Sequence, residues 1–155
     1  MNNKNLEVKI MDHNLKRFES EHENNYNNAL SEVRNGRKIS HWMWYIFPQA
    51  YGLGHSYTAN YYGIRCIDEA KAYLADPILG PHLVEISEAL MELEDKDAEK
   101  IFGFPDDLKL RSCMTLFAAV SDENSVFQQV LDAYYHGEKD ERTIEFIKQS
   151  SEYDF

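Results

Sequence analysis

Cysteine and long apolar runs are scarce or missing in this chain of 155 residues. Its two cysteines, Cys66 and Cys113, lie far apart and form no CxxC pair, which predicts buried, reduced thiols in a cytoplasmic protein. No run of about 18 apolar residues occurs, so the sequence predicts no membrane span. The polar N-terminal residues lead into no apolar segment of the kind that signal peptides carry.

Basic residues are also few compared with acidic ones. Sixteen Lys and Arg residues stand against 27 Asp and Glu residues, which gives a net charge of −11. Non-specific binding to nucleic acid needs a basic face that neutralises phosphates, so the composition excludes this class of partner. It does not exclude a small basic pocket. The acidic residues are spread over expected helices and predict a solvated face.

The common signatures of cofactor binding and catalysis are missing as well. The chain has no GxGxxG after a strand, no GKS/T phosphate loop and no GxSxG, so no cofactor is predicted, and whether the protein is an enzyme stays open. None of the six histidines forms an HExxH motif, and no metal site is predicted. Four histidines are interpreted as incidental surface residues: His13, His22, His82 and His136.

Helical periodicity is what the chain does have. Over residues 13–35, apolar side chains recur at three- and four-residue steps, and Gly36 follows at the position that favours a left-handed conformation. Ser40 is a candidate N-cap for the next helix, which must end near Phe47 because Pro48 disfavours helical geometry at the residue before it. Helices are predicted over residues 13–35, 40–46, 57–62, 68–74, 77–93, 97–102, 105–120, 125–136 and 141–150.

No strand–helix alternation, hairpin signal or internal repeat accompanies these helices. The sequence therefore predicts an all-α protein, built as an irregular array of seven to nine mostly short helices. Its length predicts a single compact domain over residues 13–150. A flexible leader is expected over residues 1–12 and a frayed tail over residues 151–155.

Segment 40–49 holds both tryptophans and the highest concentration of aromatic side chains beside titratable and polar groups. Trp42 and Trp44 are two residues apart, so on a helix they point in different directions, and one can be core while the other lines a cleft. His41 stands beside this apolar surface and is a weak candidate for a catalytic proton donor or base. The alternative is a core histidine that is hydrogen-bonded to a carbonyl.

Two further groups are candidate ligand contacts. Gln49, Gly52 and Gly54 belong to a loop in which glycine lets backbone N–H groups approach a ligand, although a tight turn is the favoured interpretation. Lys109, Arg111 and Ser112 lie in a mainly apolar helix. Arginine holds phosphate or carboxylate through paired hydrogen bonds, so an anion site and a structural salt bridge are both open there.

Several long motifs resemble the bacterial family labelled domain of unknown function 1810. They are Arg-Lys-x-Ser-His-Trp-Met-Trp-x-Ile-Phe-Pro-Gln at 37–49, Gly-Leu-Gly at 52–54, Tyr-Tyr-Gly-Ile at 61–64, Glu-Ala-x-Ala-Tyr-Leu-Ala at 69–75, Pro-Ile-Leu-Gly-Pro at 77–81 and Phe-Gly-Phe-Pro-Asp-Asp-Leu-Lys-Leu-Arg-Ser-Cys-Met-Thr-Leu-Phe at 102–117. The resemblance extends from about Leu15 to Ile147. It implies a compact, mainly helical domain and no established activity, so it assigns no catalytic residue.

Two functional hypotheses follow from the sequence. In the first, the candidate residues form a pocket for a small anionic ligand with a flat moiety, such as a nucleotide or an ADP-ribose-like molecule. In the second, the domain is a non-enzymatic interaction or structural module, and the same residues build its core. The candidate ligand-binding residues are His41, Trp42, Trp44, Gln49, Gly52, Gly54, Lys109, Arg111 and Ser112.

Overall fold

The computed structural model describes residues 13–152, which form nine helices and no strand. This confirms the all-α class for the described part of the chain. The predicted leader, and residues 153–155 of the predicted tail, lie outside that part. The helices are α2 (Lys16–Arg34), α3 (Met43–Ile46), α4 (Tyr57–Tyr61), α5 (Ile67–Ala75), α6 (Leu79–Glu92), α7 (Ala98–Phe102), α8 (Asp106–Ala119), α9 (Val126–Tyr135) and α10 (Glu141–Glu152).

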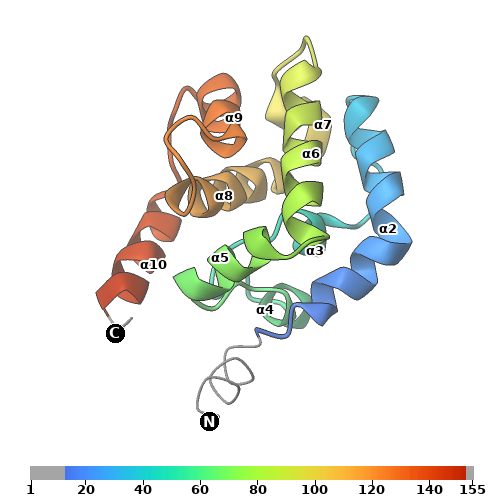
Figure 1. The fold of residues 1–155 in the computed structure, drawn as a ribbon. Helices are drawn as coiled ribbons and strands as arrows, with labels where there is room; N and C mark the ends of the chain where they lie inside the picture. Colours follow the sequence, from blue (N-terminus) through green and yellow to red (C-terminus); the bar gives the residue numbers. More distant parts are fainter. Residues whose placement is uncertain (1–12, 153–155) are drawn as a thin grey trace.

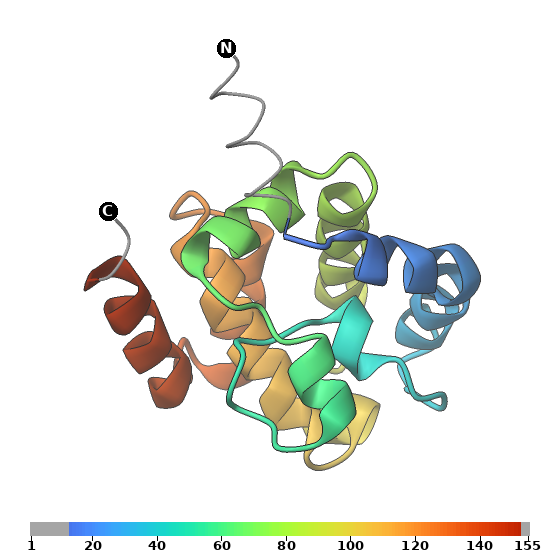
Figure 2. The same ribbon diagram turned by 90° about the horizontal axis from the view of Figure 1, so that it is seen from below.

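Helices α6 and α8 organise the array. Helix α6 packs against α2, α5 and α9, whereas α8 packs against α7, α9 and α10 (Figure 1). The connection between α3 and α5 carries the short helix α4 and lies on the underside of the molecule, as seen from below (Figure 2). One isolated parallel bridge, between Ala50 and Ile64, holds the two ends of this connection together.

The core takes side chains from most of the helices. Phe18, Ile46, Tyr73, Leu83 and Phe117 are fully or almost fully buried, and each comes from a different helix. Helices α5 and α6 approach so closely that a Cβ atom on Gly80 would lie 2.0 Å from the carbonyl oxygen of Leu74. None of the described helices is long and apolar enough to cross a membrane.

The structure also tests the predicted state of the two cysteines and the starts of two helices. Both cysteines are free; Cys113 is buried as expected, whereas Cys66 is only partly buried. Asp140 caps α10, because its Oδ2 accepts a hydrogen bond from the backbone N–H of Thr143 at 2.9 Å. The prediction that Ser40 caps the helix of the aromatic segment is wrong. That helix begins at Met43 without a side-chain cap, and the Ser40 hydroxyl donates to Glu32 instead.

Candidate functional site

The two tryptophans of segment 40–49 separate in the structure. Trp42 is 1% exposed, and its ring packs near Phe47 and edge-on to Phe102. Trp44 is partly exposed and packs at the margin of the core. Only Trp44 can therefore offer a ring face to a ligand without unfolding of the segment.

A buried carboxylate fixes this segment against α2. Glu32 accepts five hydrogen bonds, from Asn28, Ile39, both the amide and hydroxyl of Ser40, and the indole N–H of Trp42. Burial alone would raise the pKa of the Glu32 carboxyl, but the hydrogen bonds together outweigh it and lower the pKa to about 2. Glu32 therefore remains charged and acts as a structural clamp.

Three candidate residues do meet at one place. Trp44, Gln49 and Lys109 line a crevice in which the ammonium of Lys109 lies 6.0 Å from the centre of the Trp44 ring. The cavity volume is about 10 Å³. That is room for about one water molecule, so this crevice holds no ligand of nucleotide size as it stands.

The remaining candidates of the aromatic segment and its loop lie elsewhere. His41 is exposed, and its carbonyl accepts a hydrogen bond from the hydroxyl of Tyr45. Gly54 packs tightly under α4, since a Cβ atom there would lie 2.6 Å from that of Ala59. Gly52 has a φ of +96°, a conformation that favours glycine. Both glycines therefore have a structural reason for being in the loop.

The α8 candidates point in different directions. Lys109 pairs with Asp106 at 3.4 Å, and the buried hydroxyl of Ser112 donates to the carbonyl of Leu108. Arg111 faces another cavity, of about 680 Å³, and its guanidinium lies 3.9 Å from the carboxylate of Glu138. The structure thus does not bring Arg111 together with the tryptophans.

The cavity beside Arg111 is balanced in charge. Its lining consists of three cations and three acids: Arg111, Lys139, Arg142, Glu138, Asp140 and Glu141. Arg142 also donates to the carbonyls of Gly52 and Leu53 at 3.3 and 3.5 Å, so it docks the glycine loop against α10. Arg142 thus places the glycine loop beside the cavity that Arg111 lines. Much of the positive charge of this cavity already contacts carbonyl and carboxylate groups of the protein.

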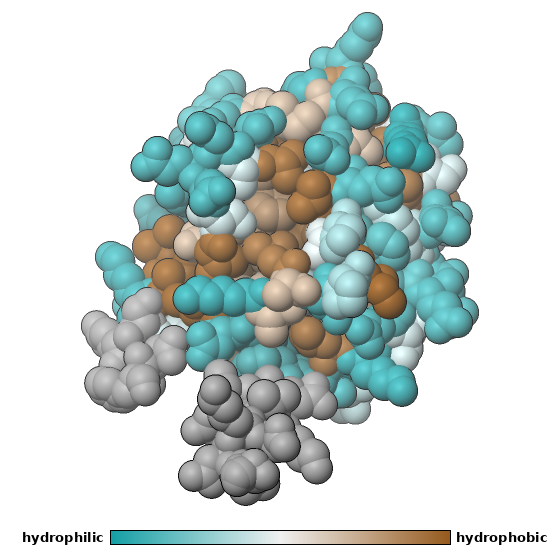
Figure 3. Space-filling view, viewed as in Figure 1, coloured by the Kyte–Doolittle hydropathy of each residue, from teal (hydrophilic) through white to brown (hydrophobic). Residues whose placement is uncertain are grey.

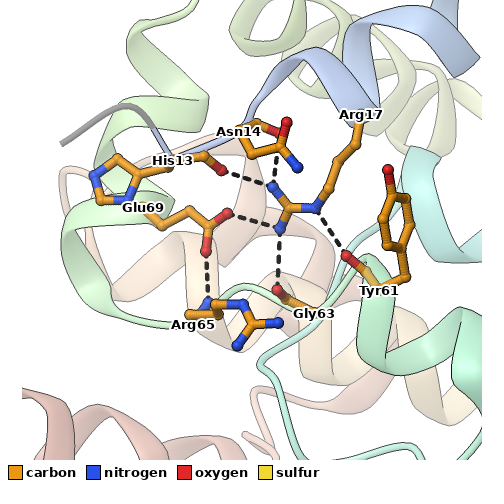
Figure 4. A network of polar contacts seen from close by, with 7 residues as sticks. All are labelled: His13, Asn14, Arg17, Tyr61, Gly63, Arg65 and Glu69. Atoms are coloured by element: carbon orange, nitrogen blue, oxygen red, sulfur yellow. Dashed lines mark hydrogen bonds and ion pairs between the residues drawn. The ribbon is translucent and has the colours of Figure 1, made fainter. Parts of the chain in front are cut away.

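A different cluster, which the sequence analysis did not select, joins three distant parts of the chain. Arg17 on α2 forms a buried ion pair with Glu69 on α5 at 2.7 Å (Figure 4). Its other N–H groups donate to the backbone carbonyls of His13, Asn14, Tyr61 and Gly63. All five N–H donors of Arg17 are used, so this guanidinium has none left for a ligand.

The same ion pair positions the rim of a cavity of about 300 Å³, here called the Arg65 cavity. Its lining includes His13, Tyr61 and Arg65 above the Arg17–Glu69 pair. The backbone of each rim residue is held by that pair: Arg17 binds the carbonyls of His13 and Tyr61, and Glu69 accepts from the amide of Arg65 at 2.6 Å. The buried ion pair thus forms the floor of the cavity and fixes the backbone from which these three side chains extend (Figure 4).

The rim combines an aromatic face with a cation. Tyr61 is 42% exposed and stacks on Tyr57, with the ring centres 6.2 Å apart. The exposed guanidinium of Arg65 lies 4.7 Å from the centre of the Tyr51 ring. Among residues 13–152, no carboxylate pairs with the Arg65 guanidinium within 4.0 Å. Arg65 is therefore the cation in this cavity whose donors remain open to an anion.

Two histidines that the sequence analysis assigned to the surface form a buried pair, so that interpretation is wrong for His22. His22 is 3% exposed, and its Nδ1 lies 2.9 Å from Nδ1 of the partly buried His82. Nε2 of His22 lies 2.8 Å from the carbonyl of Tyr45; since a carbonyl only accepts, Nε2 carries the proton. Nδ1 of His22 is then the acceptor, and His82 donates to it.

Burial governs the charge state of this pair. It lowers the pKa of His22 to about 4, with a smaller lowering from His82, against the hydrogen bond to Tyr45 that acts in the opposite direction. Burial also lowers the pKa of His82. The two rings are stacked with Tyr26, whose hydroxyl donates to Glu85 at 2.6 Å. In the described part of the chain, no group of three or more His, Cys, Asp or Glu residues is arranged to hold a metal ion.

The helices and cavities together define a small helical protein in which the buried Glu32 carboxylate and the Arg17–Glu69 ion pair hold segments of the chain together. The chain belongs to the DUF1810 family, described as "Protein of unknown function", whose pattern matches residues 12–147. This confirms the resemblance seen in the motifs.

The comparison with solved structures agrees with the family assignment. The chain is similar to the conserved hypothetical protein Rv1873 from Mycobacterium tuberculosis, known from a crystal structure. The two share 45% sequence identity, and the match covers 88% of this chain and 97% of the other, with a TM-score of 0.85. Comparison with curated proteins finds no match.

Proposed function

We propose that the protein binds a small anionic ligand with a flat moiety, such as a nucleotide, in the Arg65 cavity. The observation that carries the proposal is the exposed guanidinium of Arg65, which has no carboxylate partner among residues 13–152 and lines the same cavity as the Tyr61 ring and His13. The anion would bind Arg65, and the ring would stack on Tyr61.

Two properties of the cavity support this choice. Its floor is preorganised, because the buried ion pair between Arg17 and Glu69 fixes the backbone of the rim residues before any ligand arrives. Its lining also carries one excess positive charge when His13 is neutral, since Arg17 and Glu69 cancel. The chain as a whole has a net charge of −11 and does not attract anions, whereas this local excess of positive charge does.

The volume narrows the ligand class. About 300 Å³ is at the lower end of the range for small-molecule pockets, so a compact anion with a single ring system fits better than a dinucleotide-sized one. An ADP-ribose-like molecule would have to extend beyond the cavity onto the exposed rings of Tyr57 and Tyr61.

The test is a thermal-shift screen of nucleoside monophosphates and diphosphates, ADP-ribose and aromatic carboxylates, followed by calorimetric titration of each hit. A ligand present at about 100 times its Kd stabilises the folded state by about 2.7 kcal/mol, which gives a measurable rise in Tm. We expect the Arg65→Ala variant to lose the shift and Arg65→Lys to weaken it.

Arg111→Ala is the matched control, because it removes the same charge from the other cation-lined cavity. It should keep the shift. Loss of the shift in Arg111→Ala but not in Arg65→Ala would move the ligand to the residues that the sequence analysis favoured and overturn the Arg65 site. A screen without any hit would reject anion binding and leave the interaction module as the better hypothesis.

A further inference from the structure

A large groove lies between α6 on one side and the loop at 120–125 with the first turn of α9 on the other. Its volume is about 1190 Å³. Along α6 it is lined by Gly80, Val84, Glu88 and Met91, which recur at three- and four-residue steps and so share one face of the helix. The distance along the helix from the first to the last of these is about 17 Å.

Apolar side chains line the groove beside polar ones, which come mainly from the loop at 120–125. Leu74, Val120, Val126 and Phe127 contribute to its lining, and Val84 is 36% exposed within it. The space-filling view shows hydrophobic side chains in the hollow between α6 and α9, with hydrophilic side chains around them (Figure 3). The free energy falls when apolar side chains of a partner cover the apolar surface of such a hollow and remove it from water.

The charge on the groove is of one sign. Glu88 and Glu92 lie on the α6 side and Asp122 on the loop before α9, and all three are exposed. The described lining contains no Lys, Arg or His. Because rim charges select partners of the opposite sign, this groove favours a basic partner and rejects an acidic one.

The walls also indicate the shape of the partner. One wall is helix α6, whose backbone groups are paired within the helix, and the other is the loop at 120–125 with the first turn of α9. Neither offers a strand edge that an extended peptide could join. An amphipathic helix needs none, because it satisfies its own backbone and inserts a stripe of side chains. A length of about 17 Å accommodates about three helical turns.

We infer that the groove between α6 and α9 binds an amphipathic helix of about three turns from a partner protein. The apolar stripe of that helix lies between α6 and α9, and its Lys or Arg residues face Glu88, Glu92 and Asp122. This inference is independent of the Arg65 cavity, since the two linings share no residue.

The experiment uses the full chain and two labelled model helices of about 14 residues. One consists of Leu and Lys in an amphipathic pattern, and the other has Glu in place of Lys. Fluorescence anisotropy should show binding of the Leu–Lys helix and not of the Leu–Glu helix. Chemical-shift changes in a titration followed by NMR should fall on α6, α9 and the loop at 120–125.

Two double variants separate the groove from general attraction to an acidic protein. Glu88→Lys/Glu92→Lys reverses two exposed charges on the groove and should weaken binding at least about tenfold. Glu141→Lys/Glu145→Lys reverses two exposed charges with the same spacing on α10 and should leave the affinity within about twofold. Equal weakening by both variants, shift changes outside the groove, or no binding of the Leu–Lys helix would overturn the inference.

Discussion

Segments 40–49 and 61–69 both hold buried polar contacts to α2, but they use them in opposite ways. In the first, the Glu32 carboxylate is surrounded by neutral donors from one short turn, and the aromatic side chains close over it. In the second, Glu69 pairs with Arg17, and this pair reaches backbone groups from three stretches of the chain. The first segment buries Trp42 against its carboxylate, whereas the second leaves Tyr61 and Arg65 at the surface.

This difference between the two segments shows that a dense aromatic motif indicates a locally built core more than a cavity. Six aromatic, histidine and proline side chains within ten residues supply enough apolar surface to seal a core locally, and Trp42 is sealed in this way. A cavity needs surfaces that converge without filling the space between them. In the Arg65 cavity those surfaces come from residues about 50 positions apart, which a local motif does not reveal.

The largest expected effect on stability is at Trp42, and it distinguishes this tryptophan from Trp44. Trp42→Ala removes a fully buried indole and one of the donors to Glu32, and we expect a loss of about 5 kcal/mol in the free energy of unfolding. Trp44→Ala removes a partly exposed ring at the margin of the core and should cost about 1 kcal/mol. Urea unfolding followed by circular dichroism measures both. Equal losses would show that the two rings are not divided between core and surface.

The next effect tests the floor of the Arg65 cavity. Arg17→Met leaves the Glu69 carboxylate buried without its cation and should destabilise the protein by about 4 kcal/mol, measured by the same unfolding curves. The double variant Arg17→Met/Glu69→Met removes both charges together. It should lose less than the single variant, because no uncompensated charge remains. A double variant that is less stable than Arg17→Met would contradict the role of the ion pair.

The sequence predicted most of the helices because local patterns determine them. The predicted segments 57–62, 97–102 and 125–136 each correspond to an observed helix that differs by at most one residue at either end. The site was not predictable in the same way. Arg17 lies in a polar-looking helix next to Phe18, and Glu69 lies 52 positions further on, so their pairing is a tertiary contact without a local pattern. The surface interpretation of His22 is wrong for a related reason, because its partners Tyr45 and His82 are distant in sequence.

A smaller effect follows from the pKa of His22. In the unfolded chain a histidine has a pKa of about 6.5, whereas in the folded protein the pKa of His22 is lowered to about 4. Between these values the unfolded state binds more protons than the folded state, so stability falls as the pH falls from about 6.5 to about 4. One such group accounts for about 3 kcal/mol over that window, and His82, whose pKa is also lowered, acts in the same direction.

The His22→Gln variant checks this dependence, because glutamine can donate to the Tyr45 carbonyl but does not become charged. Its unfolding free energy should decline less steeply between pH 6.5 and 4 than that of the wild type. His41→Gln, at an exposed position, is the matched control and should reproduce the wild-type slope. A His22→Gln curve parallel to the wild type would show that His22 is not a buried neutral histidine.

The smallest effect on stability is expected at Arg65, and it completes the contrast with Arg17. Arg65→Ala removes an exposed side chain whose described contact is the Tyr51 ring, so the unfolding free energy should change by only about 0.5 kcal/mol. Arg17→Met, one layer below, should cost several times more, as argued above. The backbone amide of Arg65 continues to donate to Glu69 in the variant, which keeps the floor of the cavity intact. A loss of several kcal/mol in Arg65→Ala would mean that this guanidinium is a structural clamp like Arg17, with its donors already used, and the anion site would then have no open cation to support it.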